Sequence, residues 1–162
     1  MIATVVAGAV AATVIDLRTR RVPNALTAVL ASMGIAFAAS GISGLTIGAA
    51  LAGIGLGLAL MLPGHLLGGT GAGDVKLLGA MGALIGPAHT VTAFLYSAVA
   101  GGVIAIAVAV RRRRLQRTLG GTARLIATAA SNAADIARSH ENNRFAYAPA
   151  IAVGSIIAAL GK

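Results

Sequence analysis

The sequence predicts an all-α, polytopic membrane protein with about six transmembrane helices, and three observations support this fold class. Apolar residues make up 57% of the 162 residues and charged residues only 10%, against about 25% charged residues in a typical soluble domain. The apolar residues fall into six runs that are separated by short polar segments. Every arginine lies in the polar segments that would share one side of the membrane.

The six runs are the expected membrane spans. A helix needs about 20 apolar residues to cross the hydrocarbon core, with a lower limit of roughly 17. The first, second, fourth and sixth runs are at or below that limit, so their bounds are loose and the helices can continue past the charged residues that delimit them. The expected spans cover residues 1–15, 25–39, 42–62, 75–85, 90–110 and 146–160.

The basic residues indicate how these spans cross the membrane. The first span has no basic residue before it, unlike a secretory signal, and the first arginines follow it. Cytoplasmic loops carry an excess of Lys and Arg, so we expect the N-terminus outside and the arginine-rich face in the cytoplasm. The cytoplasmic segments would then be 16–24, 63–74 and 111–145, and the short loops 40–41 and 86–89 would lie outside.

We expect a single transmembrane domain over residues 1–162, with one longer polar segment at about 111–145. Apolar residues in that segment recur at alternating spacings of four and three, which is helical periodicity, and several arginines fall off the apolar stripe. The segment is therefore either a basic amphipathic helix on the membrane surface or a plain polar linker after the Arg111–Arg114 run. The sequence favours neither of the two.

Several classes of site are excluded or disfavoured by the composition. The chain has no cysteine, which excludes a disulfide, a thiolate nucleophile and a cysteine-based zinc site. The net charge of +9 does not indicate nucleic-acid binding, because no aromatic residues interleave with the arginines as stacking platforms. His65, His89 and His140 are far apart and lack the spacing of metal ligands, so we expect no metal and no cofactor.

Two of the four acidic residues stand out by their position. Asp135 and Glu141 lie in the polar segment, where a solvated charge is the default. Asp16 and Asp74 each border an apolar span, and the alternation of spans brings both to the same membrane face. An ionisable residue at that depth is costly and points to function, although each alone is equally well explained as a loop or helix-end residue. A close pair of carboxyls shares one proton and can activate a water molecule.

The residues around these two carboxyls carry a resemblance to a known family. The segment DLRTRRVPN at 16–24 is similar to the first signature of type IV prepilin peptidases, and GAGDVKLL at 71–78 resembles their second signature, the GxGD motif. The segment FAYAPAIAVG at 145–154 is similar to the weaker aromatic-Gly-Pro-Ala string that opens their last helix, with Ala148 in place of glycine. The three segments follow the family's order along the chain.

The resemblance implies an aspartic-type endopeptidase of the bacterial inner membrane. Its catalytic face would lie in the cytoplasm, where it removes the basic leader from prepilin or pseudopilin precursors. It implies Asp16 and Asp74 as catalytic residues, and it matches supporting positions at Arg20, Pro23, Asn24, Gly71, Gly73 and Lys76. Larger members of the family carry an added domain with a cysteine tetrad and methylate the new N-terminus. This chain resembles the short form of Flp/Tad-type pilus systems, so we expect no methyl transfer.

Two other functions fit the same residues. A small transporter or proton-relay protein also uses intramembrane acids, but such sites lie near the membrane midplane in repeated halves, and no internal repeat is visible here. A non-catalytic assembly factor for a pilus or secretion machine is the third possibility. Cleavage of a prepilin precursor by the purified protein separates the three.

Overall fold

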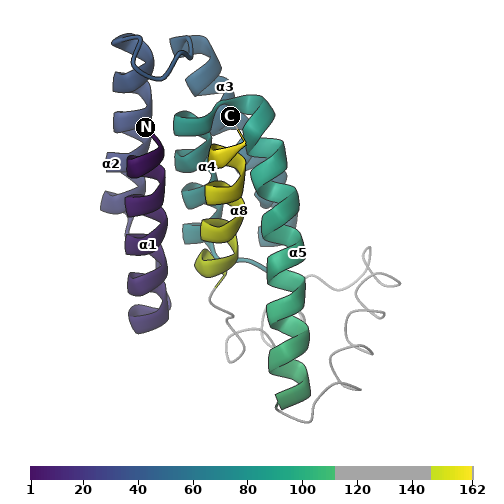
Figure 1. The fold of residues 1–162 in the computed structure, drawn as a ribbon. Helices are drawn as coiled ribbons and strands as arrows, with labels where there is room; N and C mark the ends of the chain where they lie inside the picture. The colour runs from purple at the N-terminus through teal and green to yellow at the C-terminus, as the bar shows by residue number, and fades with distance from the viewer. Residues whose placement is uncertain (112–146, 162) are drawn as a thin grey trace.

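The computed structural model describes residues 1–111 and 147–161, and all regular structure in these residues is α-helical. Figure 1 shows the helices side by side as an up-and-down bundle, each running opposite to the one before it along the chain. The all-α class predicted from the sequence is therefore confirmed. The helices are α1 (Ile2–Thr19), α2 (Asn24–Ala39), α3 (Ile47–Leu66), α4 (Ala72–Ile85), α5 (Pro87–Arg111) and α8 (Ala148–Leu160).

The helix ends differ from the expected spans where charged residues or glycines were taken as limits. Helix α1 continues past Asp16 to Thr19, so that Asp16 lies inside its last turns. Helix α3 begins five residues later than the expected span, because Gly44 adopts a positive φ of 67° and the Thr46 side chain caps the helix by accepting from the Ala49 amide. It then continues through Pro63 to Leu66.

The glycine-rich segment before Asp74 is less irregular than the sequence suggests. The fourth span was expected to begin at residue 75, after a polar segment at 63–74, but α4 begins at Ala72 and includes Gly73. Gly71 is the N-cap residue, and its amide donates to the Asp74 side chain, which stabilises the first turn despite the two glycines. The irregular backbone is therefore confined to the connection between α3 and α4.

Helix α4 is the centre of the bundle. It is in contact with α1, α2, α3, α5 and α8, and its residues from Leu77 to Ile85 are all buried. Helix α3 approaches it closely at Gly53 and Gly57, where a methyl group would lie 2.7 Å from a backbone atom of Gly82 and of Leu78 respectively. Gly55 on the same helix is exposed and faces open space. Gly53 and Gly57 thus pack inside the protein, against the backbone of α4.

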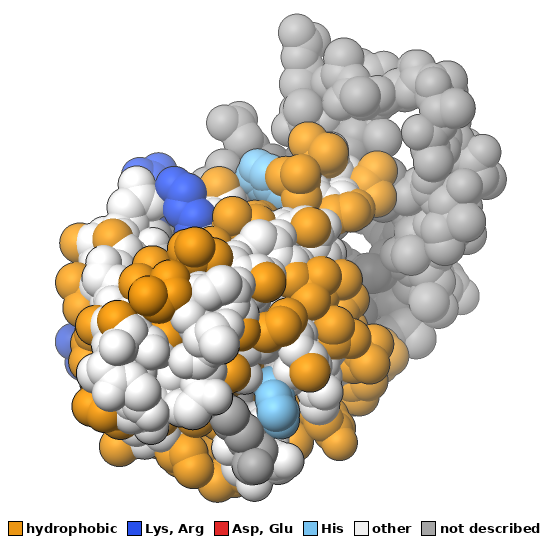
Figure 2. Space-filling model, turned by 90° about the horizontal axis from the view of Figure 1, so that it is seen from above, with side chains coloured by type: hydrophobic (Ala, Val, Ile, Leu, Met, Phe, Trp, Pro, Cys, Tyr) orange, Lys and Arg blue, Asp and Glu red, His pale blue; other side chains and the backbone are white. Residues whose placement is uncertain are grey.

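The outer surface of the bundle is apolar. Large hydrophobic side chains on α5 point outward, with Val99 66% exposed and Val103 and Ile106 each 62% exposed. Figure 2 shows hydrophobic side chains around the bundle seen from above, and no acidic side chain in that view. Helices α1, α3 and α5 are long and apolar enough to cross a membrane, whereas α2 and α8 are apolar but shorter. Large apolar side chains on the outer surface, together with apolar helices of this length, are typical of a membrane protein.

The expected surface helix or linker at 111–145 lies outside the described residues, apart from Arg111 at the end of α5. Asp135, Glu141 and His140 lie there as well.

The up-and-down arrangement predicts which positions are accessible from each side of a membrane. Ser40 follows α2 and Ala88 lies in the first turn of α5, and both are exposed at one end of the bundle, whereas Arg18 and Leu67 are exposed at the other. Because the chain has no cysteine, a single introduced cysteine is the only labelling site. With a membrane-impermeant maleimide on intact cells, we expect S40C and A88C to react and R18C and L67C to react only after permeabilisation. Labelling of 18 and 67 from opposite sides contradicts the arrangement.

Candidate active site

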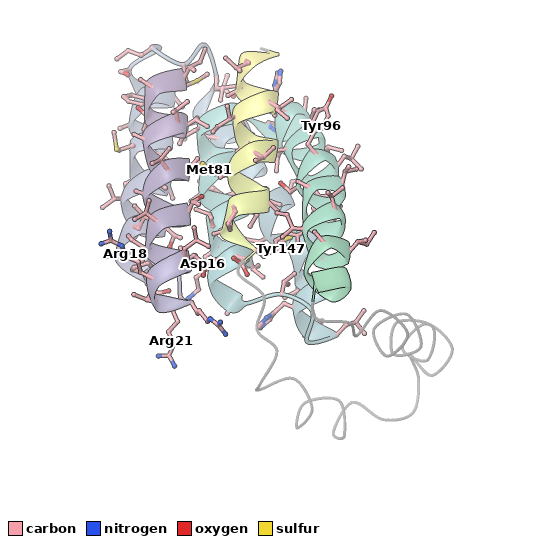
Figure 3. The ribbon with its side chains drawn as sticks, turned by 60° about the horizontal axis from the view of Figure 1, so that its bottom comes forward. Asp16, Arg18, Arg21, Met81, Tyr96 and Tyr147 are labelled. Atoms are coloured by element: carbon pink, nitrogen blue, oxygen red, sulfur yellow. The ribbon has the colours of Figure 1, made fainter. Side chains whose placement is uncertain are left out.

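Asp16 is a buried carboxyl near the C-terminal end of α1. It is 4% exposed, and its Oδ2 accepts a hydrogen bond from the Ala148 amide of α8, with a nitrogen-to-oxygen distance of 3.3 Å. Helices α1 and α8 pack against each other, so residues 132 positions apart in the sequence meet at this point. The amide belongs to the first turn of α8, where the positive end of the helix dipole favours a negative charge. Figure 3 shows Asp16 at this end of the bundle, close to the start of α8.

Asp74 is the second buried carboxyl, in the first turn of α4. It is 6% exposed, and its Oδ2 accepts from the Gly71 amide at 3.0 Å. Asp74 precedes the expected fourth span, 75–85, and lies at the end of the bundle where α4 begins. Burial raises the pKa of Asp74 to about 6, against the opposing effect of the Gly71 hydrogen bond, and the charge of Asp16 raises it further.

The two carboxyls lie at the same end of the bundle. The charge of Asp16 contributes to the raised pKa of Asp74, after burial, which indicates that the two are neighbours. Among the described residues, no Lys, Arg or His nitrogen forms an ion pair with either carboxyl, although Arg18, Arg20 and Arg21 follow Asp16 directly. Backbone amides are thus their described partners. A pair of carboxyls in this setting holds one proton more readily than it loses both.

The turn between α1 and α2, which follows Asp16, packs against the start of α4, which carries Asp74. Arg20 ends α1 in the left-handed conformation, with φ of 53°, and its amide donates to the Asp16 carbonyl oxygen at 2.7 Å. The chain then turns so that Val22 is buried, and Pro23 is the N-cap residue of α2. Gly73 lies directly against Val22, since a methyl group on Gly73 would be 3.0 Å from its Cβ. Through this contact the residues after Asp16 pack on the residue before Asp74.

A side-chain hydrogen bond on the surface joins the starts of α2 and α4 beside these contacts. Lys76 Nζ donates to Asn24 Oδ1 at 2.9 Å, joining the first turns of α2 and α4 across 52 residues of sequence. Both side chains are exposed, so the bond orients the two helix ends more than it stabilises the fold. All eight site residues predicted from the sequence lie at this end of the bundle. They belong to the end of α1, to the turn between α1 and α2, to the start of α2 and to the start of α4.

The histidines that the structure describes take no part in the carboxyl pair. His65 is near the end of α3, and its Nδ1 is 2.9 Å from the Thr70 carbonyl oxygen, while His89 lies in the first turn of α5 at the opposite end of the bundle. In the described ranges, no three His, Asp or Glu side chains converge as metal ligands would.

The first turn of α8 is a component to which the sequence analysis assigned no role. Ala148 is the residue whose amide reaches Asp16, and Tyr147 precedes it as the N-cap. The available signal was the aromatic residue and proline in FAYAPAIAVG, which mark the start of a helix. Nothing in that string indicated which carboxyl the helix would meet.

The fold and this site define a helical bundle with an apolar surface and a pair of buried aspartates at one end. Residues 3–106 match the type IV leader peptidase family, and this match covers both Asp16 and Asp74. The chain belongs to that family, and it is therefore a peptidase, a hydrolase of the leader-peptidase kind. No curated protein and no solved structure matches the chain.

The environment of Asp74 predicts a pH-dependent effect of its removal on stability. Because burial raises its pKa to about 6 from 3.8, ionised Asp74 destabilises the fold above about pH 6, and this cost disappears as the pH falls through that range towards 4. Asp74→Asn keeps an acceptor for the Gly71 amide but carries no charge. We expect it to raise the melting temperature in detergent at pH 8 by several degrees, from at most about 3 kcal/mol, and to have no effect at pH 4.

The matched control is Arg18→Gln, which removes an exposed charge from the same end of the bundle and should show no such pH dependence. A loss of stability for Asp74→Asn at pH 8 contradicts the assignment of Asp74 as a carboxyl buried at a cost in stability.

Proposed function

We propose that the protein is an aspartic-type prepilin peptidase that removes the basic leader from type IV, Flp-like prepilins or pseudopilins at the cytoplasmic membrane face. The observation that carries this proposal is the pair Asp16 and Asp74: two buried carboxyls at one end of the bundle, held by backbone amides, with the charge of one acting on the other. Membership of the leader peptidase family supports the substrate class.

The chemistry follows from one proton shared by two carboxyls. The ionised carboxylate takes a proton from a water molecule, whose oxygen attacks the carbonyl carbon of the scissile peptide bond. The protonated carboxyl donates to the carbonyl oxygen, which gives a tetrahedral intermediate. The intermediate then collapses as the C–N bond breaks. The leaving amine takes the proton that the first carboxylate had accepted, and the second carboxyl, now ionised, takes a proton back from a hydroxyl of the intermediate. Each carboxyl thus acts once as a base and once as an acid, and the proton count is restored.

The position of the site supports cleavage at a membrane face. In a bundle of six alternating spans with the N-terminus outside, the Asp16 and Asp74 end faces the cytoplasm, where Arg18, Arg20 and Arg21 are also exposed. A prepilin carries its leader on the same side and an apolar helix within the bilayer. The substrate therefore meets the enzyme by lateral diffusion, since a basic leader is not attracted to a basic face.

The buried pair also bears on the transporter alternative. A proton relay requires acids along a path through the bundle, near the midplane. Among the described residues, the two acids both lie at one end, and α4 beyond Lys76 is a buried run of apolar residues and glycines from Leu77 to Ile85. The arrangement favours hydrolysis at the face over transport through the bundle.

Removal of either carboxyl should abolish the reaction. We expect Asp16→Asn and Asp74→Asn each to reduce cleavage of a prepilin precursor to background, because a lone carboxyl cannot supply both a base and an acid. Asp135→Asn and Glu141→Gln, in the polar segment, are the controls and should cleave like the parent protein. The measurement is precursor processing in membranes, normalised to the amount of each variant. Full cleavage by either Asp16→Asn or Asp74→Asn would sink the proposal.

The contact between Gly73 and Val22 predicts a second loss of activity. In Gly73→Val, the added side chain must displace Val22 and with it the turn that follows Asp16, so we expect a large loss of turnover, roughly 100-fold for a displacement of about 1 Å. Gly55→Val is the matched control, because it adds the same side chain to a helix at a position that faces open space. Equal turnover of the two variants means that the Gly73 contact does not position the carboxyls.

A further inference from the structure

Tyr147, the residue before α8, is hydrogen-bonded to α5 and packs against it. It is half-buried, and its hydroxyl donates to the Ser97 carbonyl oxygen at 3.1 Å. Its ring lies on Gly101, one turn further along α5, where a methyl group would be 2.8 Å from both Cζ and the phenol oxygen. The phenol ring therefore occupies the space that a side chain at position 101 would need. Figure 3 shows Tyr147 between α8 and α5, at the same end of the bundle as Asp16.

The next residue supplies the amide that holds Asp16. In the first turn of α8, the Ala150 and Ile151 amides donate to the Tyr147 carbonyl oxygen, and Pro149 has no N–H. The Ala148 amide is left without a partner inside the helix, and it donates to Asp16 Oδ2. Where α8 begins thus decides whether this amide reaches the carboxyl.

We infer that Tyr147 is a positioning residue for Asp16: its ring, packed on Gly101 of α5, fixes the start of α8, so that the Ala148 amide meets the Asp16 carboxylate. The inference rests on the proposed function, in which Asp16 is one of two catalytic carboxyls. Tyr147 itself acts through Ala148, and the Tyr147 hydroxyl is already used by Ser97.

The surroundings of Asp16 make this amide important. Helix α8 contributes the Ala148 amide and the Tyr147 phenol, and α4 contributes the carboxyl of Asp74, which is of like charge. Among the described residues, no cation is within ion-pair distance, and the Ala148 amide is the donor to the Asp16 side chain. An amide donor favours the ionised carboxylate, which is the form that removes a proton from water. A displacement of α8 therefore makes ionised Asp16 less favourable and lowers the rate of proton removal, but it leaves substrate binding unchanged.

The test compares four variants of the full-length protein in detergent or membranes with a prepilin precursor: Tyr147→Ala, Tyr147→Phe, Gly101→Ala and Gly102→Ala. We expect Tyr147→Ala and Gly101→Ala to lower kcat per folded enzyme by roughly 10-fold to 100-fold, with KM little changed. Tyr147→Phe keeps the ring on Gly101 and should retain most of the activity. Gly102→Ala is the matched control, since position 102 faces open space, and should resemble the parent protein.

The pH profile separates positioning from a general loss of structure. If the Ala148 amide no longer holds Asp16, the acidic limb of the kcat profile moves to higher pH in Tyr147→Ala and Gly101→Ala, and stays in place in Tyr147→Phe and Gly102→Ala. Three outcomes overturn the inference: an unchanged kcat per folded enzyme in Tyr147→Ala, a loss of kcat with an unshifted profile, or a rise in KM alone. Failure of the proposed function has a different signature, namely full cleavage by Asp16→Asn whatever Tyr147 does.

Discussion

Two buried carboxyls in an apolar helix bundle require hydrogen-bond donors, and in the part of the chain that the structure describes these donors are backbone amides. Asp16 receives the amide at the start of α8, and Asp74 receives the Gly71 amide at the start of α4. Both donors are N-terminal amides that a helix leaves unpaired, and both carry the favourable end of the helix dipole. An arginine partner would lower the pKa of a carboxyl and fix its charge, whereas an amide supports the charge and still leaves the carboxyl able to take up a proton.

The position of these two helix ends depends on close packing through small residues. Helix α4 reaches the centre of the bundle because Gly53 and Gly57 let the backbone of α3 approach it, and the start of α8 reaches Asp16 because Tyr147 fits over Gly101. Without a hydrophobic driving force between apolar helices in a bilayer, such close contacts are a main source of association. The glycines of this chain thus set the distances between the helices that hold the carboxyls.

Much of this arrangement was predictable from the sequence, and the differences have local causes. The all-α class followed from the composition, and the two aspartates stood out because each borders an apolar run. Helix ends were less predictable: the apolar run that marks α1 stops at residue 15, and the sequence did not say how far the helix continues, whereas α1 extends to Thr19 with the Asp16 carboxyl buried and hydrogen-bonded to α8. Gly73 was expected in a loop, but Gly71 and Asp74 cap the helix that includes it. The contribution of Tyr147 and Ala148 depends on a contact across 132 residues, which periodicity and spacing do not encode.

The central claim is that Asp16 and Asp74 form one site, and it can be tested without any substrate. The chain has no cysteine, so the double variant Asp16→Cys/Asp74→Cys carries two thiols, and a short bifunctional maleimide can join them only if they are close. The account predicts efficient intramolecular cross-linking of this pair, read by mass spectrometry of the joined peptides, and none for Asp16→Cys/Ala88→Cys, whose positions lie at opposite ends of the bundle. Failure of the 16 and 74 pair to cross-link, when each cysteine alone reacts with the reagent, would contradict it.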